Sequence, residues 1–148
     1  MIMKHFLTFF SALCLINLNG IAYGAPLILA SEAALPDGSI ATYTRGIVRG
    51  PGVDIISPDL NSHIKRPFDL KVDFKEHGGN LIDKSSIKVV YVKSPLIDLT
   101  PRFQNGLSTK GLVFLGAEVP PGDHVIRISL KDIDGRETSK LITLKVKD

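Results

Sequence analysis

The clearest hydrophobic pattern in the chain lies in the stretch PFDLKVDFKEHGG, residues 67–79. Four apolar residues alternate there with charged ones: Phe68, Leu70, Val72 and Phe74. A period of two places all four on one face of an extended strand, whereas a helix would scatter them around its circumference. The pattern therefore predicts a strand with one face in a hydrophobic core and the other face in water.

The remainder of the chain after Val53 also consists of short apolar or alternating runs separated by turn residues. Further strands are predicted at VDIISP, SIKVVYVK, GLVFLGAEV and in both halves of HVIRISLKDIDGRETSKLITLKVK. Asp134-Gly135 is a strong hairpin signal, and Pro120-Pro121-Gly122 ends the strand before it. SIKVVYVK is apolar on both faces, which favours a central strand. About seven short strands without a long helical pattern indicate a β-sandwich.

The N-terminus has a different pattern. A start with one positive charge at Lys4 precedes the apolar run HFLTFFSALCLINL, which is too short to span a bilayer. Ala22 and Gly24 then place small residues at the −3 and −1 positions that a signal peptidase requires. The sequence predicts a signal peptide at residues 1–24, with cleavage between Gly24 and Ala25. Export to the periplasm or out of the cell follows from this prediction.

Residues 25–52 are broken by closely spaced glycines and prolines, and they mix these with short apolar runs. Such spacing interrupts any long element, so we expect a loosely ordered N-terminal arm that packs on its own domain or on a partner. The domain proper is predicted at residues 53–148. No second hydrophobic segment of membrane length follows the leader, so the processed chain is not expected to span a membrane.

Composition narrows the possible functions. Cys14, the single cysteine, lies in the leader, so the processed chain has no disulfide and no thiolate metal site. The net charge of +3 includes Lys4, and lysines alternate with aspartates along the same segments. Mixed charge of this kind solubilises a surface and does not form the basic patch that nucleic acid requires.

A motif order in the C-terminal third points to a family. It runs Pro121-Gly122-Asp123-His124, the aliphatic alternation around Ile126-Arg127-Ile128, the turn Asp132-Ile133-Asp134-Gly135 and a return strand that begins near Thr138-Ser139. This order resembles the last two strands of bacterial immunoglobulin-like modules of surface and exported proteins, and VDIISP…PFDLKVDF looks like their first strand pair. The resemblance covers residues 53–148 and implies a bacterial source. It implies a single Ig-like or fibronectin III-like sandwich, although the cysteine pair and tryptophan of antibody domains are missing.

Motifs for catalysis or for a cofactor are not found. No serine lies in a Gly-x-Ser-x-Gly elbow, and the chain has neither a phosphate-binding loop nor a dinucleotide-binding glycine motif. His63, His77 and His124 are isolated from one another, so no metal site is predicted from them. A weak calcium candidate remains at Asp132 and Asp134, but Arg136 follows at once and turn formation explains the same residues.

A partner-binding surface is predicted in the proline-punctuated stretch at residues 93–114, together with the arm before Val53. Loops on a rigid scaffold usually make the ligand contacts in sandwich domains. The stretch is apolar with few charges, and its candidate contact residues are Leu96, Ile97, Leu99, Arg102, Phe103 and Leu107. The alternative is that these residues only cap the end of the core.

Together these observations favour a non-catalytic exported module that binds a protein or a cell-envelope component. A carbohydrate-binding sandwich is the alternative, although sugar platforms usually expose aromatic rings and the processed chain has only Tyr43 and Tyr91 besides its phenylalanines. A small hydrolase is a weaker third possibility, because no catalytic constellation supports it.

Overall fold

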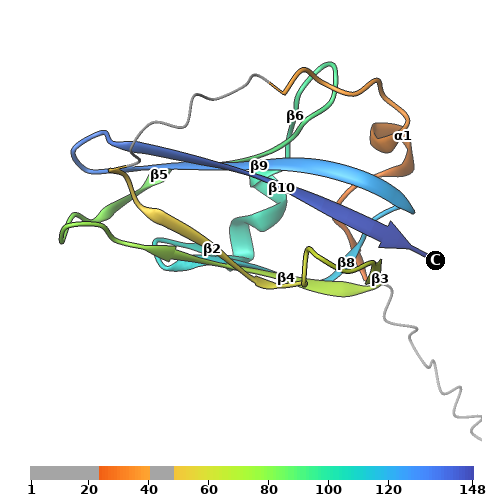
Figure 1. The fold of residues 1–148 in the computed structure, drawn as a ribbon, viewed down its shortest axis with the longest axis horizontal. Helices are drawn as coiled ribbons and strands as arrows, with labels where there is room; N and C mark the ends of the chain where they lie inside the picture. The colour runs from red at the N-terminus through yellow and green to blue at the C-terminus, as the bar shows by residue number, and fades with distance from the viewer. Residues whose placement is uncertain (1–23, 41–48) are drawn as a thin grey trace, which may run out of the picture.

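The structure is a computed structural model, and it describes residues 24–40 and 49–148. Two β-sheets lie face to face over a common core, as the sequence predicts for an all-β sandwich (Figure 1). The signal peptide predicted at residues 1–24 lies, apart from Gly24, outside the described residues. Within the described residues, no helix is both long enough and apolar enough to cross a membrane.

The first sheet has the strand order β1-β8-β4-β2, and β7 also pairs with β8. Its strands are β1 (Ala25–Pro26), β8 (Gly111–Glu118), β4 (Phe68–Lys75), β2 (Gly52–Ser57) and β7 (Leu107–Ser108). The second sheet has the order β3-β10-β9-β5-β6. Its strands are β3 (Ile64–Lys65), β10 (Glu137–Lys147), β9 (Gly122–Asp132), β5 (Ile82–Tyr91) and β6 (Ile97–Asp98). Six described strands are therefore long and four have two residues, where about seven strands were expected.

Strand β4 confirms the clearest sequence pattern. Leu70 and Val72 are 0% and 1% exposed, and β4 lies between β2 and β8. Its charged residues face outward, where Lys71 lies 3.5 Å from Asp69 and Lys75 lies 2.5 Å from Asp54. The alternation thus separates a dry face from a charged face, as a strand on a one-sided core requires.

The β9–β10 hairpin confirms the predicted turn at Asp132–Gly135. The two strands pair in a continuous antiparallel register in which Ile126 lies beside Ile142, and both side chains are buried. Gly135 has a φ of 79°, a value that glycine adopts without strain. Strand β5, predicted to be central, pairs with β9 on one side and with the two-residue β6 on the other.

Residues 25–40 of the predicted N-terminal arm pack on the sandwich, which is one of the two alternatives expected for this arm. Strand β1 pairs in parallel with the end of β8, and α1 (Ala30–Ala33) follows it. Leu27 and Ile28 are 0% and 2% exposed and belong to the core, because their apolar side chains fill the end of the sandwich. Residues 41–48 of the predicted arm lie outside the described residues.

The N-terminal strand and the C-terminus lie at the same end of the sandwich. Ala25 lies beside Ala117 near the end of β8, and Val146 lies beside Gly122 at the start of β9. The short connection at residues 119–121 joins these two strands. The β9–β10 turn lies at the opposite end (Figure 1).

Candidate functional site

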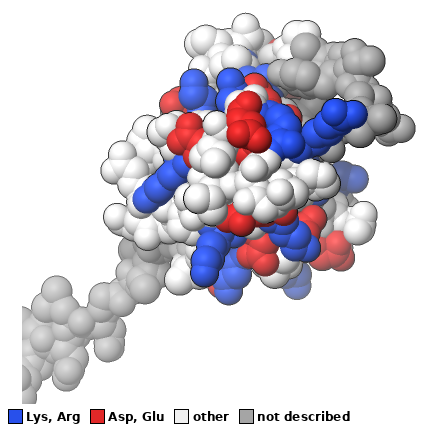
Figure 2. Space-filling view, turned by 90° about the vertical axis from the view of Figure 1, so that its left-hand side faces the viewer, with Lys and Arg blue, Asp and Glu red and all other residues white. Residues whose placement is uncertain are grey.

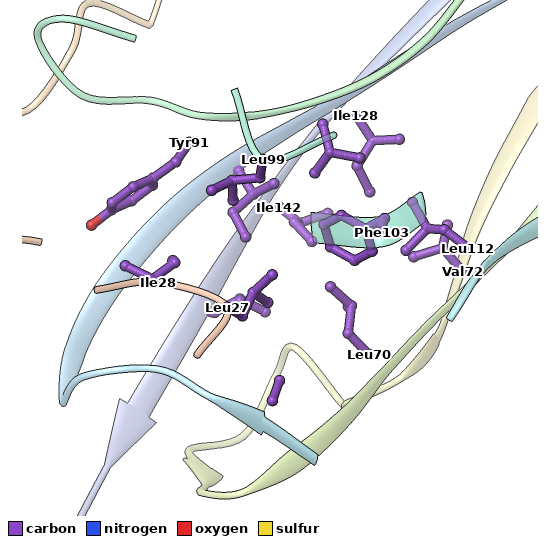
Figure 3. Packing of buried hydrophobic residues seen from close by; sticks show 14 of the residues in the cluster. Leu27, Ile28, Leu70, Val72, Tyr91, Leu99, Phe103, Leu112, Ile128 and Ile142 are labelled. Carbon is purple, nitrogen blue, oxygen red and sulfur yellow. The ribbon is translucent and has the colours of Figure 1, made fainter. Parts of the chain in front are cut away.

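The segment predicted to bind a partner contains a 3₁₀ helix, η1 (Thr100–Gly106), that packs into the core. Pro101 lies in its first turn, where the lack of a backbone N–H costs no helical hydrogen bond. Leu99 and Phe103 are 0% and 1% exposed, and Figure 3 shows them among buried side chains of the two sheets. These two residues, predicted to contact a partner, complete the core in the folded chain, which is the alternative that the sequence left open.

The other predicted contact residues are spread over different surroundings. Leu96 is 53% exposed and lies before β6, whereas Ile97 and Leu107 are half-buried against the core. Arg102 is directed toward α1, and its guanidinium donates hydrogen bonds to the Glu32 carboxylate and to the Leu27 carbonyl. The structure therefore does not bring the six predicted residues together into one surface.

A different surface combines the two segments that the sequence singled out. A groove of about 410 Å³ lies between the N-terminal strand, η1 and the outward side of β8. We call it the η1–β8 groove, and its lining residues are Ala25, Arg102, Asn105, Gly106, Val113, Phe114 and Leu115. Most of this lining is apolar. Phe114 is supported from the core side by Phe103, whose ring centroid lies 5.4 Å away in an edge-to-face arrangement.

Val113 and Leu115 are the residues that sequence reasoning missed. They are 41% and 63% exposed, and Val113 pairs with Lys71 on the charged outer face of the first sheet. The signal was available in GLVFLGAEV, where both alternating sets are apolar although the strand lies near the edge of its sheet. Large exposed aliphatic side chains beside a groove are a feature of interaction surfaces.

An ion pair fixes one wall of the groove. Arg102 holds the Glu32 carboxylate through two hydrogen bonds, Nη1 to Oε2 at 2.9 Å and Nη2 to Oε1 at 2.5 Å. Oε2 also accepts the backbone N–H of Leu29 at the start of α1. The Arg102 hydrogen bond lowers the pKa of Glu32, against the opposing effect of burial. This Glu32–Arg102 clamp joins the N-terminal segment to η1.

The opposite end of the sandwich carries a second apolar surface. Leu81 and Ile133 are 58% and 64% exposed, and the Ile133 N–H donates to the Leu81 carbonyl at 3.0 Å. We call this surface the turn end. Figure 2 views the molecule from this side and shows an uncharged area between two groups of charged side chains. It is the second candidate for a partner-binding surface.

The two carboxylates of the weak calcium candidate, Asp132 and Asp134, are paired with the guanidinium of Arg136. Arg136 donates from Nε to Asp132 Oδ2 at 2.8 Å and from Nη2 to Asp134 Oδ2 at 2.9 Å. Asp132 Oδ1 accepts two backbone N–H groups of the same turn. The two carboxylates therefore stabilise the hairpin turn. Among the described residues, no group of three potential metal-ligating side chains is found.

A buried polar chain links β5, β9 and the N-terminal segment. His124 Nε2 lies 2.8 Å from the Pro120 carbonyl, four residues earlier, so Nε2 must carry the proton. Nδ1 then accepts from the Tyr91 hydroxyl, at 2.8 Å. The Lys93 ammonium lies 5.5 Å from the Tyr91 ring centroid and 2.6 Å from the Asp37 carboxylate. Both nitrogens of His124 are engaged, so this chain acts in positioning the strands.

The geometry of the η1–β8 groove suits an apolar side chain and offers no grouped acid, base or nucleophile. Its charged member, Arg102, is held by Glu32. Comparisons of this chain with protein-family models, with curated proteins and with solved structures give no significant match in any of the three.

Proposed function

We propose that this chain is an exported, non-catalytic immunoglobulin-like module that binds a protein or a cell-envelope component through the η1–β8 groove. The observation that carries the proposal is the exposed pair Val113 and Leu115, beside a groove whose walls are fixed by the core and by the Glu32–Arg102 clamp. A rigid, mostly apolar concavity with exposed aliphatic rims is typical of sites that accept apolar side chains of a partner.

The strand order supports the immunoglobulin-like part of the proposal. The runs β2-β4-β8 and β10-β9-β5 correspond to strands A-B-E and G-F-C of that fold. His124 supports it as well. Immunoglobulin-like domains often carry a tyrosine near the start of strand F whose hydroxyl bonds to the backbone a few residues earlier. His124 lies near the start of β9 and makes the equivalent bond to Pro120.

The carbohydrate-binding alternative has less support. Such a site needs an exposed aromatic platform, and Tyr91 is 0% exposed. Tyr43 lies outside the described residues. Partner binding through aliphatic residues therefore remains the better proposal.

Two matched substitutions test the proposed surface. Leu115→Ser removes an aliphatic side chain that is 63% exposed at the groove, and Ile133→Ser removes one that is 64% exposed at the turn end. Each variant, produced as the exported chain, is used to capture partners from envelope extracts. We expect Leu115→Ser to lose the partner that the unaltered chain retains, and Ile133→Ser to keep it. The reverse result would move the site to the turn end, and turnover on esterase, glycosidase or peptidase substrates would reject the non-catalytic assignment.

A further inference from the structure

Gly24, the residue just before β1, lies close to the side chain of Glu118. Strand β1 runs parallel to the end of β8, with Pro26 beside Glu118, and the Leu27 N–H donates to the Glu118 carbonyl at 2.9 Å. The Glu118 side chain turns back over Gly24. A Cβ placed on Gly24 would lie 2.8 Å from Cγ and 3.2 Å from Oε1 of Glu118. The Glu118 side chain therefore lies against Gly24, the residue that precedes Ala25.

The Glu118 carboxylate has no cationic partner among the described residues, although ion pairs are frequent elsewhere in them. Arg102, the charged residue that lines the groove, donates from its two terminal nitrogens to Glu32 and to the Leu27 carbonyl. Glu118 is half-buried, so a carboxylate in this position gains from a positive charge close by.

Cleavage between Gly24 and Ala25 would create such a charge. The nitrogen of Ala25 lies about 2.4 Å from the Gly24 Cα, as standard peptide geometry requires. In the uncleaved chain this nitrogen belongs to a neutral amide, whereas in the processed chain it is an α-ammonium. The removal of Gly24 also vacates the space that the Glu118 side chain faces.

We propose that Glu118 binds the α-ammonium of Ala25 in the processed chain, as the counter-ion of the new N-terminus. This inference rests on the proposed export and on cleavage after Gly24. The ion pair joins the first residue of β1 to the last residue of β8, and it forms only after the leader is removed. Removal of the leader thereby adds an ion pair that holds β1, which borders the η1–β8 groove, to β8.

The pKa of the N-terminal amine tests the inference directly. The processed chain is purified after export, the mass of its N-terminal peptide is determined, and the α-amino group is titrated by NMR. We expect an α-amino pKa about one unit above the ordinary value of roughly 8. Glu118→Gln is expected to return it to the ordinary value. Glu76→Gln, which removes an exposed carboxylate before the β4–β5 turn, is expected to leave the raised pKa unchanged.

The outcomes separate this inference from the proposed function. An N-terminus at Ala25 whose pKa is the same in the unaltered chain and in Glu118→Gln overturns the ion pair and leaves export intact. An N-terminus at another residue overturns both the cleavage position and the ion pair. Because the pKa is measured on folded protein at equilibrium, a small change in stability in Glu118→Gln does not affect the reading.

Discussion

His124 joins strand β9 to two other parts of the fold through its two ring nitrogens. One nitrogen donates to the Pro120 carbonyl and the other accepts from Tyr91, while the ring itself is 3% exposed. Burial, assisted by the positive charge of Lys93, lowers the pKa of His124, although the Pro120 hydrogen bond acts in the opposite direction. The neutral form is therefore the one that the folded protein stabilises.

This lowered pKa predicts a loss of stability in mild acid. The pKa of histidine in an unfolded chain is about 6.5, so below that pH the unfolded state binds a proton that the native state resists. The free energy of unfolding should be constant above about pH 6.5 and fall as the pH drops toward 5, by at most about 1.4 kcal/mol per pH unit for one proton. Urea denaturation across this range measures the slope.

His124→Phe should abolish the slope, since the titrating group is gone, even though Tyr91 and Pro120 lose a partner. His77→Gln, in the exposed turn after β4, should retain it. An unchanged slope in His124→Phe would show that another group titrates.

Phe103 and Leu96 give a second test at the scale of single residues. Both were predicted as partner contacts, but Phe103 is 1% exposed and Leu96 is 53% exposed. Phe103→Ala should cost about 3–5 kcal/mol of unfolding free energy, because it leaves a cavity in the core. Leu96→Ala should change it by less than about 0.5 kcal/mol. Similar effects of the two substitutions, measured by denaturant unfolding, would contradict the packing of η1.

The N-terminal segment and η1 depend on each other at the scale of elements. The Glu32 and Arg102 side chains are 15% and 27% exposed, so water weakens their attraction less than it does for surface pairs. A double-mutant cycle with Glu32→Gln and Arg102→Ala should give a coupling energy of about 1–3 kcal/mol. Amide hydrogen exchange at Leu27 should accelerate in either single variant.

The exposed pair Lys131 and Glu137, which joins β9 to β10, is the control for this cycle. Its side chains are 49% and 53% exposed, and its coupling should stay below about 1 kcal/mol. Equal coupling in the two cycles would mean that the clamp does not hold the N-terminal segment.

The elements that could be predicted from the sequence are those set by local signals, whereas contacts between distant segments could not be predicted. Strands β4, β9 and β10 were predictable because alternation and turn residues are local signals, complete within about ten residues. The docking of Leu27 and the burial of Phe103 depend on contacts with distant strands, which no local period encodes. The exposed surface formed by Val113 and Leu115 was missed for a related reason. An apolar strand face has the same residue pattern whether or not another element covers it.

At the scale of the whole molecule, processing and folding make different demands on Gly24. Within the fold, a Cβ at this position would overlap the carbonyl oxygen of Gly116, whereas a signal peptidase accepts alanine at −1. If the leader is removed, Gly24→Ala yields the same processed chain, with the same mass and melting temperature as the unaltered protein. If the leader stays attached, the overlap should lower the stability by about 1–3 kcal/mol. Mass spectrometry and thermal unfolding of the exported product decide between these results.

Ala25 and the last residues of β10 lie at the same end of the sandwich, so Leu81 and Ile133 lie at the opposite end. A linker joined to either extremity of the chain would hold the molecule in the same orientation, with Leu81 and Ile133 pointing away from the anchor. The η1–β8 groove, which Ala25 borders, would then open close to the anchoring surface. A partner that binds in the groove would then have to approach from the side, close to the anchoring surface.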